Sequence, residues 1–522
     1  MSMKHSFVIV LFLALAAVSC KKEKTSWSTN WNAPLVHGQL TINDLIPADY
    51  TTTNGDNYMS IVYNETAFSL NLDSIVKMPD TTIVEKTAFG IAITVNPGFY
   101  WQNSADQIYE LDDIQLKQVL AKGGTITFSC KSEWGGKTIM TLDFPKVTLA
   151  GVPFNRSYYL DAGSVANPTI ESDMVDMAGY WIDLTGVDGL QYNTLSGNFI
   201  VESNETVTSY DVSTSDSLTY EVKFENVALD YAKGYFGQHT LSDTTVVDLP
   251  FMNSIIGGTI DIDSIDMTII IKNGFNLIAQ AELSLLKGIN TLNSNEVDLN
   301  FPNLGQTLNI NPASGGLYGW SYSEYPLTIN NSNSNITAFI ENLPNTLQVG
   351  YNIAINPYGN TTAGSDEVFP GSTIDVVVNG EFPFDLGANN LTLTDTFNFS
   401  YTGSSSYSGE SATITLDYTN GFPMGADATL FLLDENDAVL DQIQGNIPIQ
   451  SGAYNTTTYQ TTNAVGQVIY TLSQEQISML ENTARIAVIV SFTTDGAQKV
   501  KFDANASFDF DLTSNLQISL SL

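Results

Sequence analysis

Basic residues are scarce in this chain of 522 residues. It holds 19 Lys and Arg against 56 Asp and Glu, which gives a formal charge of −37 at pH 7. A surface this acidic repels phosphate backbones, and this argues against nucleic-acid binding. Charged residues make up only 14% of the chain and hydrophobic residues 43%. The composition is therefore that of folded domains and not of a disordered acidic tail.

Cysteine and histidine are also rare. The two cysteines are Cys20 and Cys130. Beyond Cys20 the only cysteine is Cys130, so no intrachain disulfide is expected and a C-x-x-C metal or redox site is excluded. After the leader the histidines are His37 and His239, and neither a G-x-S-x-G nor an H-E-x-x-H motif is present. The sequence predicts no catalytic residue, and we expect a protein that is not an enzyme.

Long apolar runs are missing after residue 19, so no transmembrane helix is expected there. The chain starts with Lys4, His5 and an apolar run over 7–18, which is typical of a secretory signal peptide over 1–19. The signal ends Ala17-Val18-Ser19-Cys20 and resembles the lipobox of bacterial lipoproteins. That resemblance implies fatty acylation of Cys20, for example with palmitate, and a membrane anchor. The alternative is an ordinary signal peptide in which Cys20 is incidental.

Alternation of apolar and polar residues at period two dominates the rest of the chain. It predicts a mainly β protein of several domains, built from β-sandwich-like or curved antiparallel sheets. Two short helices are expected, over 112–122 and over 473–482, the second with Ser473 and Gln476 at capping-box spacing. A helical turn over 41–46 could use Asn43 as its cap. Each of the two helices precedes a strand, a break at Gly and another strand, which suggests an internal duplication.

Asn-Gly interrupts predicted strands at three places: Asn273-Gly274-Phe275, Asn379-Gly380 and Asn420-Gly421-Phe422. Asn-Gly supplies positive φ and suits kinks or bulges, so we interpret these places as one repeated supersecondary unit. The predicted domains follow the chain in order. They are a lipidated tether over 20–35, an N-terminal β domain over 36–190, a middle β domain over 191–330 and a C-terminal β domain over 331–522.

The lipobox, the segment YAKGYFGQHTL (231–241) and the NGF(P) units resemble a widespread group of outer-membrane lipoproteins of Bacteroidota. The resemblance spans most of the mature chain, and its motifs are structural. It implies a lipid-anchored protein of the outer membrane. Surface-exported members usually carry an acidic cluster after the lipidated cysteine, whereas this chain has Lys21-Lys22-Glu23-Lys24. The face of the membrane, periplasmic or cell-surface, therefore stays open.

Two groups of residues are candidates for ligand binding. Tyr318, Trp320 and Tyr322 alternate, which places their rings on one face of a predicted strand, where they could stack on sugars or pack into a core or a seam between domains. Asp434, Glu435 and Asp437 offer the oxygen ligands that calcium prefers, although their place between two alternating runs equally suits a solvated hairpin turn.

Together these features predict a non-enzymatic binding or scaffold module of the cell envelope, anchored through Cys20. Apart from the covalent lipid and a calcium ion at the acidic turn, no cofactor is expected. Partners could be an envelope protein, a lipid or a glycan. The alternatives are a carrier that binds a lipid or other apolar ligand in a curved-sheet groove, and an envelope glycan-binding module.

Overall fold

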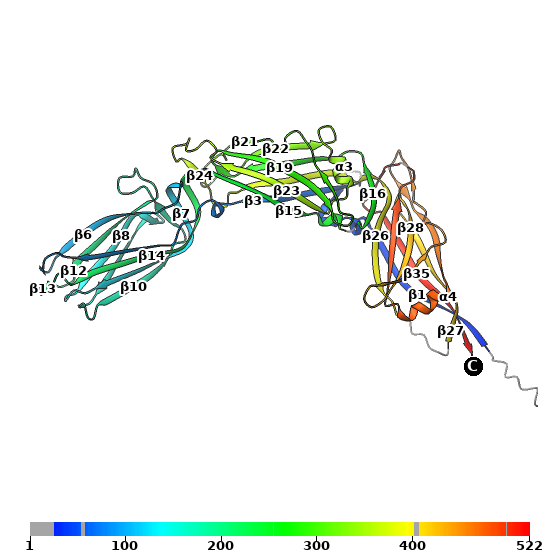
Figure 1. The fold of residues 1–522 in the computed structure, drawn as a ribbon, viewed down its shortest axis with the longest axis horizontal. Coiled ribbons are helices and arrows are strands. Elements are labelled where there is room, and N and C mark those ends of the chain that lie inside the picture. The colour runs from blue at the N-terminus through cyan, green and yellow to red at the C-terminus, as the bar shows by residue number, and fades with distance from the viewer. Residues whose placement is uncertain (1–25, 54–57, 254, 401–406, 497, 522) are drawn as a thin grey trace, which may run out of the picture.

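The computed structural model describes residues 26–53, 58–253, 255–400, 407–496 and 498–521. Strands account for 61% of the chain and helices for 6%. The predicted mainly β fold with curved antiparallel sheets is confirmed. The described chain forms three sandwiches in series along a curved, elongated body (Figure 1). We call them the distal, middle and proximal modules, where the proximal module holds both ends of the described chain.

Each module contains eight principal strands, which we number 1 to 8 along the chain. In the distal module they are β4 Thr81–Ala88, β6 Tyr100–Ile108, β7 Gln115–Ser132, β8 Thr138–Leu149, β9 Val152–Leu160, β10 Thr169–Asp176, β12 Thr194–Ser203 and β14 Ser217–Tyr235. In the middle module they are β3 Met59–Leu70, β15 His239–Asp248, β17 Asp266–Asn273, β19 Ala279–Asn290, β20 Asn295–Asp298, β22 Ser323–Asn330, β23 Thr346–Ile355 and β25 Ile374–Pro383. In the proximal module they are β1 Ser26–Thr41, β26 Asp385–Asn398, β27 Tyr407–Asn420, β28 Gly425–Leu433, β29 Val439–Gln444, β32 Ala464–Leu472, β33 Arg485–Thr493 and β35 Ser507–Ser521.

The three modules share one topology. In each, strands 1-8-3-6 form one antiparallel sheet, as in β1-β35-β27-β32, and strands 2-7-4-5 form the other, as in β26-β33-β28-β29. The middle module repeats this order as β3-β25-β17-β22 and β15-β23-β19-β20, and the distal module as β4-β14-β7-β10 and β6-β12-β8-β9. Eight strands in this order make a jelly roll. The described part of the chain is a row of three jelly rolls.

Smaller elements join or extend these sheets. The short strands are β2 Thr51–Thr53, β5 Ile93–Val95, β11 Tyr180–Asp183, β13 Tyr210–Val212, β16 Gly257–Ile262, β18 Phe275–Asn276, β21 Leu308–Ile310, β24 Asp366–Val368, β30 Ala453–Tyr454, β31 Thr461–Thr462 and β34 Val500–Lys501. The described helices are α2 Ile42–Leu45, α3 Ile336–Glu341 and α4 Gln474–Met479, and 3₁₀ turns lie at Ala48–Tyr50, Leu72–Ser74, Pro250–Met252 and Leu480–Asn482.

The N-terminal segment contributes to all three modules. Strand 1 is β1 in the proximal module, β3 in the middle module and β4 in the distal module, so residues 26–88 run the length of the body. The chain then returns through the distal, middle and proximal modules in turn. Pairing therefore crosses the predicted boundaries at 190 and 330. The predicted tether is a strand from Ser26 onward, because Ser26–Thr41 pairs with β35; residues 1–19 and Cys20 lie outside the described residues.

The helix expected over 112–122 was wrong, because from Gln115 onward this segment is the start of β7. Leu116 and Val119 are both fully buried, although their spacing of three residues does not fit a regular strand. The register between β7 and β14 shifts between Lys233 and Gly234, so Lys117 bulges out and both apolar side chains face the core.

The helix expected at 473–482 is confirmed as α4 and its 3₁₀ extension. Ser473 and Gln476 form the predicted capping box, with Gln476 N–H donating to Ser473 Oγ at 3.2 Å and Ser473 N–H donating to Gln476 Oε1 at 2.9 Å. The turn at 41–46 is α2, but its cap is Thr41 together with Asp44 and not Asn43. No sequence pattern predicted α3, which precedes β23 as α4 precedes β33.

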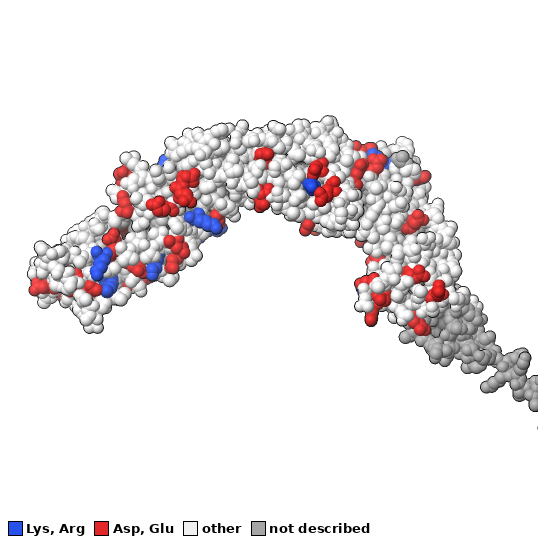
Figure 2. Space-filling view, viewed as in Figure 1, with Lys and Arg blue, Asp and Glu red and all other residues white. Residues whose placement is uncertain are grey.

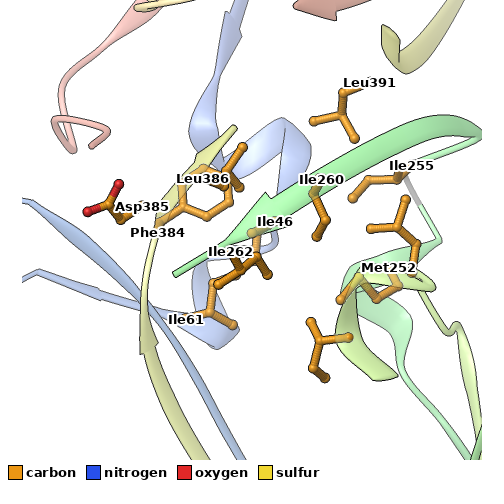
Figure 3. Close-up of a pocket in the computed structure, with 12 residues that line it drawn as sticks. Ile46, Ile61, Met252, Ile255, Ile260, Ile262, Phe384, Asp385, Leu386 and Leu391 are labelled. Carbon is orange, nitrogen blue, oxygen red and sulfur yellow. The ribbon is translucent and has the colours of Figure 1, made fainter. Parts of the chain in front are cut away.

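The joint between the middle and proximal modules is closed and apolar. Figure 3 shows Ile61, Ile260 and Leu386 pointing toward one another, while the carboxylate of Asp385 points away. The space they leave is about 30 Å³, roughly the room for one water molecule. Buried residues form one core that continues from the proximal through the middle to the distal module.

The two Asn-Gly-Phe triplets, at 273–275 and 420–422, occupy equivalent places at the end of strand 3. Asn273 and Asn420 are completely buried. Each amide Nδ2 donates to two backbone oxygens: Asn273 to those of Leu277 (3.2 Å) and Asn311 (2.9 Å), and Asn420 to those of Met424 (2.8 Å) and Gln450 (2.8 Å). In each triplet Asn Oδ1 accepts the Phe N–H at 2.9 Å. Asn379 differs, because it lies inside β25.

The glycines of these triplets do not have the expected positive φ. Their role is close approach. A Cβ at Gly274 would lie 2.8 Å from the carbonyl oxygen of Thr373, and one at Gly421 would lie 2.8 Å from that of Ser507. The same oxygens accept the N–H groups of Gly274 and Gly421, each at 2.8 Å, so strand 3 is tied to the start of strand 8.

We expect Asn420→Ala to lower the local free energy of unfolding of the proximal module by about 2–4 kcal/mol, because it leaves buried backbone groups without partners. Native-state hydrogen exchange of β27 and β28 amides in the full chain measures this. Asn379→Ala is the matched control, since Asn379 Oδ1 has no hydrogen-bond partner among the described residues; we expect a loss below about 1 kcal/mol. Equal losses would contradict the account.

Candidate binding site at the free end of the distal module

The end of the middle module that carries Asn273 is covered by the distal module. There β24, which lies in the loop between strands 7 and 8 of the middle module, pairs with two strands. They are β18 of the middle module and β14 of the distal module. Tyr231 of β14 donates its hydroxyl to Glu367 Oε1 at 2.7 Å, and Lys233 Nζ lies 3.4 Å from the same oxygen. Sheet pairing and charge thus hold this joint together.

The equivalent end of the proximal module is covered by the middle module. Phe502, again between strands 7 and 8, packs on Phe384 with ring centroids 4.7 Å apart. Its carbonyl oxygen accepts Met59 N–H at 3.1 Å, and the oxygen of Met59 accepts Phe384 N–H at 2.9 Å. In both joints the loop between strands 7 and 8 contacts the next module.

The corresponding end of the distal module is the free end of the body (Figure 1). At this end the place of Asn-Gly-Phe is taken by Ser132, Glu133 and Trp134. The strand register shows this equivalence, because Ser132 pairs with Leu218 of strand 8 as Asn273 pairs with Ile374 of strand 8 in the middle module. Ser132 Oγ accepts Trp134 N–H at 3.3 Å, and Glu133 N–H donates to the carbonyl oxygen of Ser217 at 3.0 Å. The backbone arrangement of the joints is repeated here, although no further module in the described ranges covers this end.

The carboxylate of Glu133 is buried beneath this end, with the residue 6% exposed. It lies 2.7 Å from Lys131 Nζ and accepts the N–H of Ser217 at 3.1 Å and its hydroxyl at 2.6 Å. The hydrogen bonds from Lys131 and Ser217 outweigh burial and lower the pKa of Glu133. The group is ionised at neutral pH and ties β7 to β14.

Aromatic rings support the loops at the free end. Trp134 is 1% exposed and packs against Phe89 (5.7 Å), Phe99 (5.9 Å) and Tyr210 (6.4 Å between ring centroids). Its Nε1 has no hydrogen-bond partner among the described residues. The loops themselves, 89–99 and 204–216, are joined by the pairing of β5 with β13.

Two aliphatic side chains project from these loops into solvent. Ile91 is 72% exposed and Val207 is 86% exposed. We call the surface made by residues 89–99 and 204–216 the tip. Sequence reasoning missed it. The break at Gly135-Gly136 marked the end of a strand, but nothing local showed that Glu-Trp replaces Gly-Phe of the other modules.

The three predicted aromatic residues do not form a platform. Residues 311–322 are a loop and not a strand, so alternation does not place the rings on one face. Tyr318 is 92% exposed, whereas Trp320 stacks on Phe369 at 6.2 Å and meets Tyr322 edge-on at 4.9 Å. Phe369 packs with Tyr231, so Trp320 belongs to the seam between the middle and distal modules.

The predicted acidic cluster is the turn between β28 and β29. Asp434 Oδ1 accepts the N–H groups of Asn436 and Ala438, both at 2.8 Å. Asp437 Oδ1 lies 2.7 Å from the Arg485 guanidinium, which also donates to the carbonyl oxygen of Glu435 at 3.3 Å. A guanidinium thus stands beside the carboxylate that calcium would need. Within the described ranges, no group of three or more His, Cys, Asp or Glu is arranged to hold a metal ion.

The remaining reactive side chains lie far apart. Cys130 is fully buried on β7, and burial raises its pKa to about 12. His37 pairs with Asp511 across β1 and β35, with Nδ1 2.8 Å from Oδ1, on an exposed face. His239 Nε2 lies 4.0 Å from Asp113 Oδ1. None of the helices in the part of the chain that the structure describes has the length and apolar character needed to cross a bilayer.

Charge is distributed unevenly along the body. Nine of the 19 basic residues belong to the distal module, and on the face shown in Figure 2 most Lys and Arg side chains lie there. They are Lys86, Lys117, Lys122, Lys131, Lys137, Lys146, Arg156, Lys223 and Lys233. Residues 385–521 of the proximal module contain 15 Asp and Glu and three Lys and Arg. The proximal module is therefore strongly anionic.

Comparisons with known proteins do not assign the chain to a family. No family model and no curated protein matches it. A crystal structure of a candidate secreted protein from Parabacteroides distasonis aligns over 94% of this chain and 99% of its own, at 10% identity and a TM-score of 0.32. The structure of the infectious bursal disease virus Gx strain aligns over 92% of this chain and 85% of its own, at 8% identity and a TM-score of 0.14. Scores this low carry no argument about function.

The free end should loosen at acid pH. The folded-state pKa of Glu133 is lowered below the value of about 4.3 for an unfolded glutamate, so its stabilising effect is present above that pH and is lost as the pH falls through the folded-state pKa. We expect the protection factor of the Ser217 amide against hydrogen exchange to fall as the pH is lowered below about 4.3, and Glu133→Gln to show a much smaller pH dependence. Glu475→Gln on α4 is the control. An unchanged pH dependence in Glu133→Gln would contradict the account.

Proposed function

We propose that this protein is a non-enzymatic binding or scaffold arm of the cell envelope, anchored in the outer membrane by lipid on Cys20, which presents its tip to a protein partner. The observation that carries the proposal is the pairing of β1 with β35, because it places both ends of the described chain at the proximal module and leaves the tip at the other end. An anchor and a contact surface are thereby separated by the whole body.

The position of Cys20 supports anchoring at the proximal end. It precedes Ser26, the first residue of β1, by six residues, and such a segment spans at most about 20 Å. Strands of 15 residues in β35, 12 in β3 and 19 in β14 imply a path from the anchor to the tip of roughly 150 Å along the curve. The reach of the arm would come from its strands and not from a flexible linker.

The charge of the proximal module supports an upright position. With 15 acids against three basic residues in 385–521, it is repelled by anionic head groups. The lipid would hold the end of the module while electrostatic repulsion keeps its faces away from the bilayer.

The tip is the favoured contact surface because its loops correspond to those that make the two joints within the chain. Loops between strands 7 and 8 contact a neighbouring β module in both joints, through β24 and through Phe502. At the tip the corresponding loop, 204–216, carries exposed Val207 beside the loop of exposed Ile91. We propose a protein partner that meets the tip with the end of a β sandwich. The glycan-binding alternative has less support, because Tyr318 alone of the three rings is well exposed.

Photo-crosslinking in intact envelopes tests this function. A photoreactive residue at Val207 should capture one defined envelope protein. The same residue at Val465, 78% exposed on β32 of the proximal module, is the control and should not capture that protein. The captured protein, once purified, should bind the full chain and bind Ile91→Asp at least about tenfold more weakly, because a charge replaces an apolar contact. Capture of the same neighbours from both positions would contradict the proposal.

A further inference from the structure

We infer that the proximal module contains a binding site for a single-chain amphiphile whose head group is a hydroxyl or an amine. The site is a cleft of about 410 Å³ between the two sheets of this jelly roll. Sites for small ligands commonly enclose about 300–1,000 Å³ of mostly apolar space. The inference concerns the proximal module and is independent of the tip and its partner.

The cleft opens at the edge where strands 1 and 2 of the module face each other. These strands are β1 and β26, and they are separated in the chain by the whole of the distal and middle modules. No hairpin therefore closes this edge. Leu40 of β1 and Leu393 of β26 line the cleft from the two sheets and remain half-buried.

The interior of the cleft is apolar. Its lining includes Leu416 of β27 and Phe508 and Phe510 of β35 from one sheet, and Val488 and Val490 of β33 from the other. All five are buried. The ring of Phe510 lies over Gly38, where a Cβ would overlap with its Cζ, so the ring lies beside β1 at the wall of the cleft. An alkyl chain would replace water here and gain from burial.

The mouth of the cleft selects the head group. Asp44, Asp395, Asn253 and Thr394 line it, and among the described residues no Lys or Arg belongs to the lining. The sequence has no basic residue between Lys287 and Arg485, which covers β26 and β27. Asp395 is exposed, and its one described hydrogen bond is with the N–H of Thr396 at 2.7 Å. Two carboxylates without a cation repel a carboxylate or phosphate head group and accept hydrogen bonds from a hydroxyl or an amine.

Three ligands with the same chain test the site: decan-1-ol, decylamine and decanoate, each below its aggregation limit. The protein is the full mature chain with Cys20→Ser, so that no detergent competes, and binding is measured by titration calorimetry at pH 7. We expect saturable binding of the alcohol and the amine at one site and binding of decanoate at least about tenfold weaker, because of like-charge repulsion. Leu393→Trp fills the cleft and should weaken binding of the alcohol at least about tenfold.

Two further variants distinguish binding at this site from nonspecific binding elsewhere on the protein. Val465→Trp adds the same ring at an exposed position of the same module and should leave binding of all three ligands unchanged. Asp395→Asn should reduce the preference for decylamine over decanoate by a factor of about three or more, without weakening the alcohol. Absence of saturable binding of the alcohol and the amine, equal affinity for decanoate and decylamine, or full binding by a folded Leu393→Trp chain would each overturn the inference.

Discussion

The pairing of residues 26–88 with the last strand of every module is the constraint on which the structure depends. β1 pairs with β35, β3 with β25 and β4 with β14. Each of the three jelly rolls takes its first strand from this segment. The distal module is continuous in the chain, from β4 to β14, whereas the middle and proximal modules are each closed by a strand that lies far from their other seven in the sequence. Pairings between residues hundreds of positions apart make folding slow, because the chain must close very long loops before the contacts stabilise it. In return, one segment fixes the order and direction of all three modules.

The same pairing makes the two ends of the body different. Both ends of the described chain lie at the proximal module, and strand 3 of each module ends toward the tip. At two of the three ends a buried asparagine satisfies the backbone where one module meets the next, and at the third the ion pair of Glu133 and Lys131 takes a related place. The joint around Phe384 is closed and apolar, and the other joint combines sheet pairing through β24 with the contacts of Glu367. The free end instead keeps its aromatic rings below loops that carry exposed aliphatic side chains.

Local sequence patterns predicted what depends on local physics. Alternation at period two identified the strands, and the spacing of Ser473 and Gln476 identified α4, because a capping box is made within four residues. The helix over 112–122 failed since a bulge at Lys117 reproduces a helix-like spacing of apolar residues. The domain boundaries could not be predicted from the sequence, because nothing near residues 26–88 indicates which distant strands they pair with. The cleft between β1 and β26 could not be predicted for the same reason. A seam between domains was one of the alternatives left open for Trp320, but the sequence did not show which modules it joins.

The most direct test of the anchored arm is energy transfer between the protein and a bilayer. Cys130 is buried, so a donor dye can be placed on Glu475→Cys of α4 in the proximal module or on Val207→Cys at the tip. The natively processed chain is reconstituted in vesicles that carry an acceptor lipid. The account predicts strong transfer from position 475, none above background from position 207, and no vesicle binding when Cys20 is replaced by Ser. Equal transfer from both positions, or binding that persists without Cys20, would contradict it.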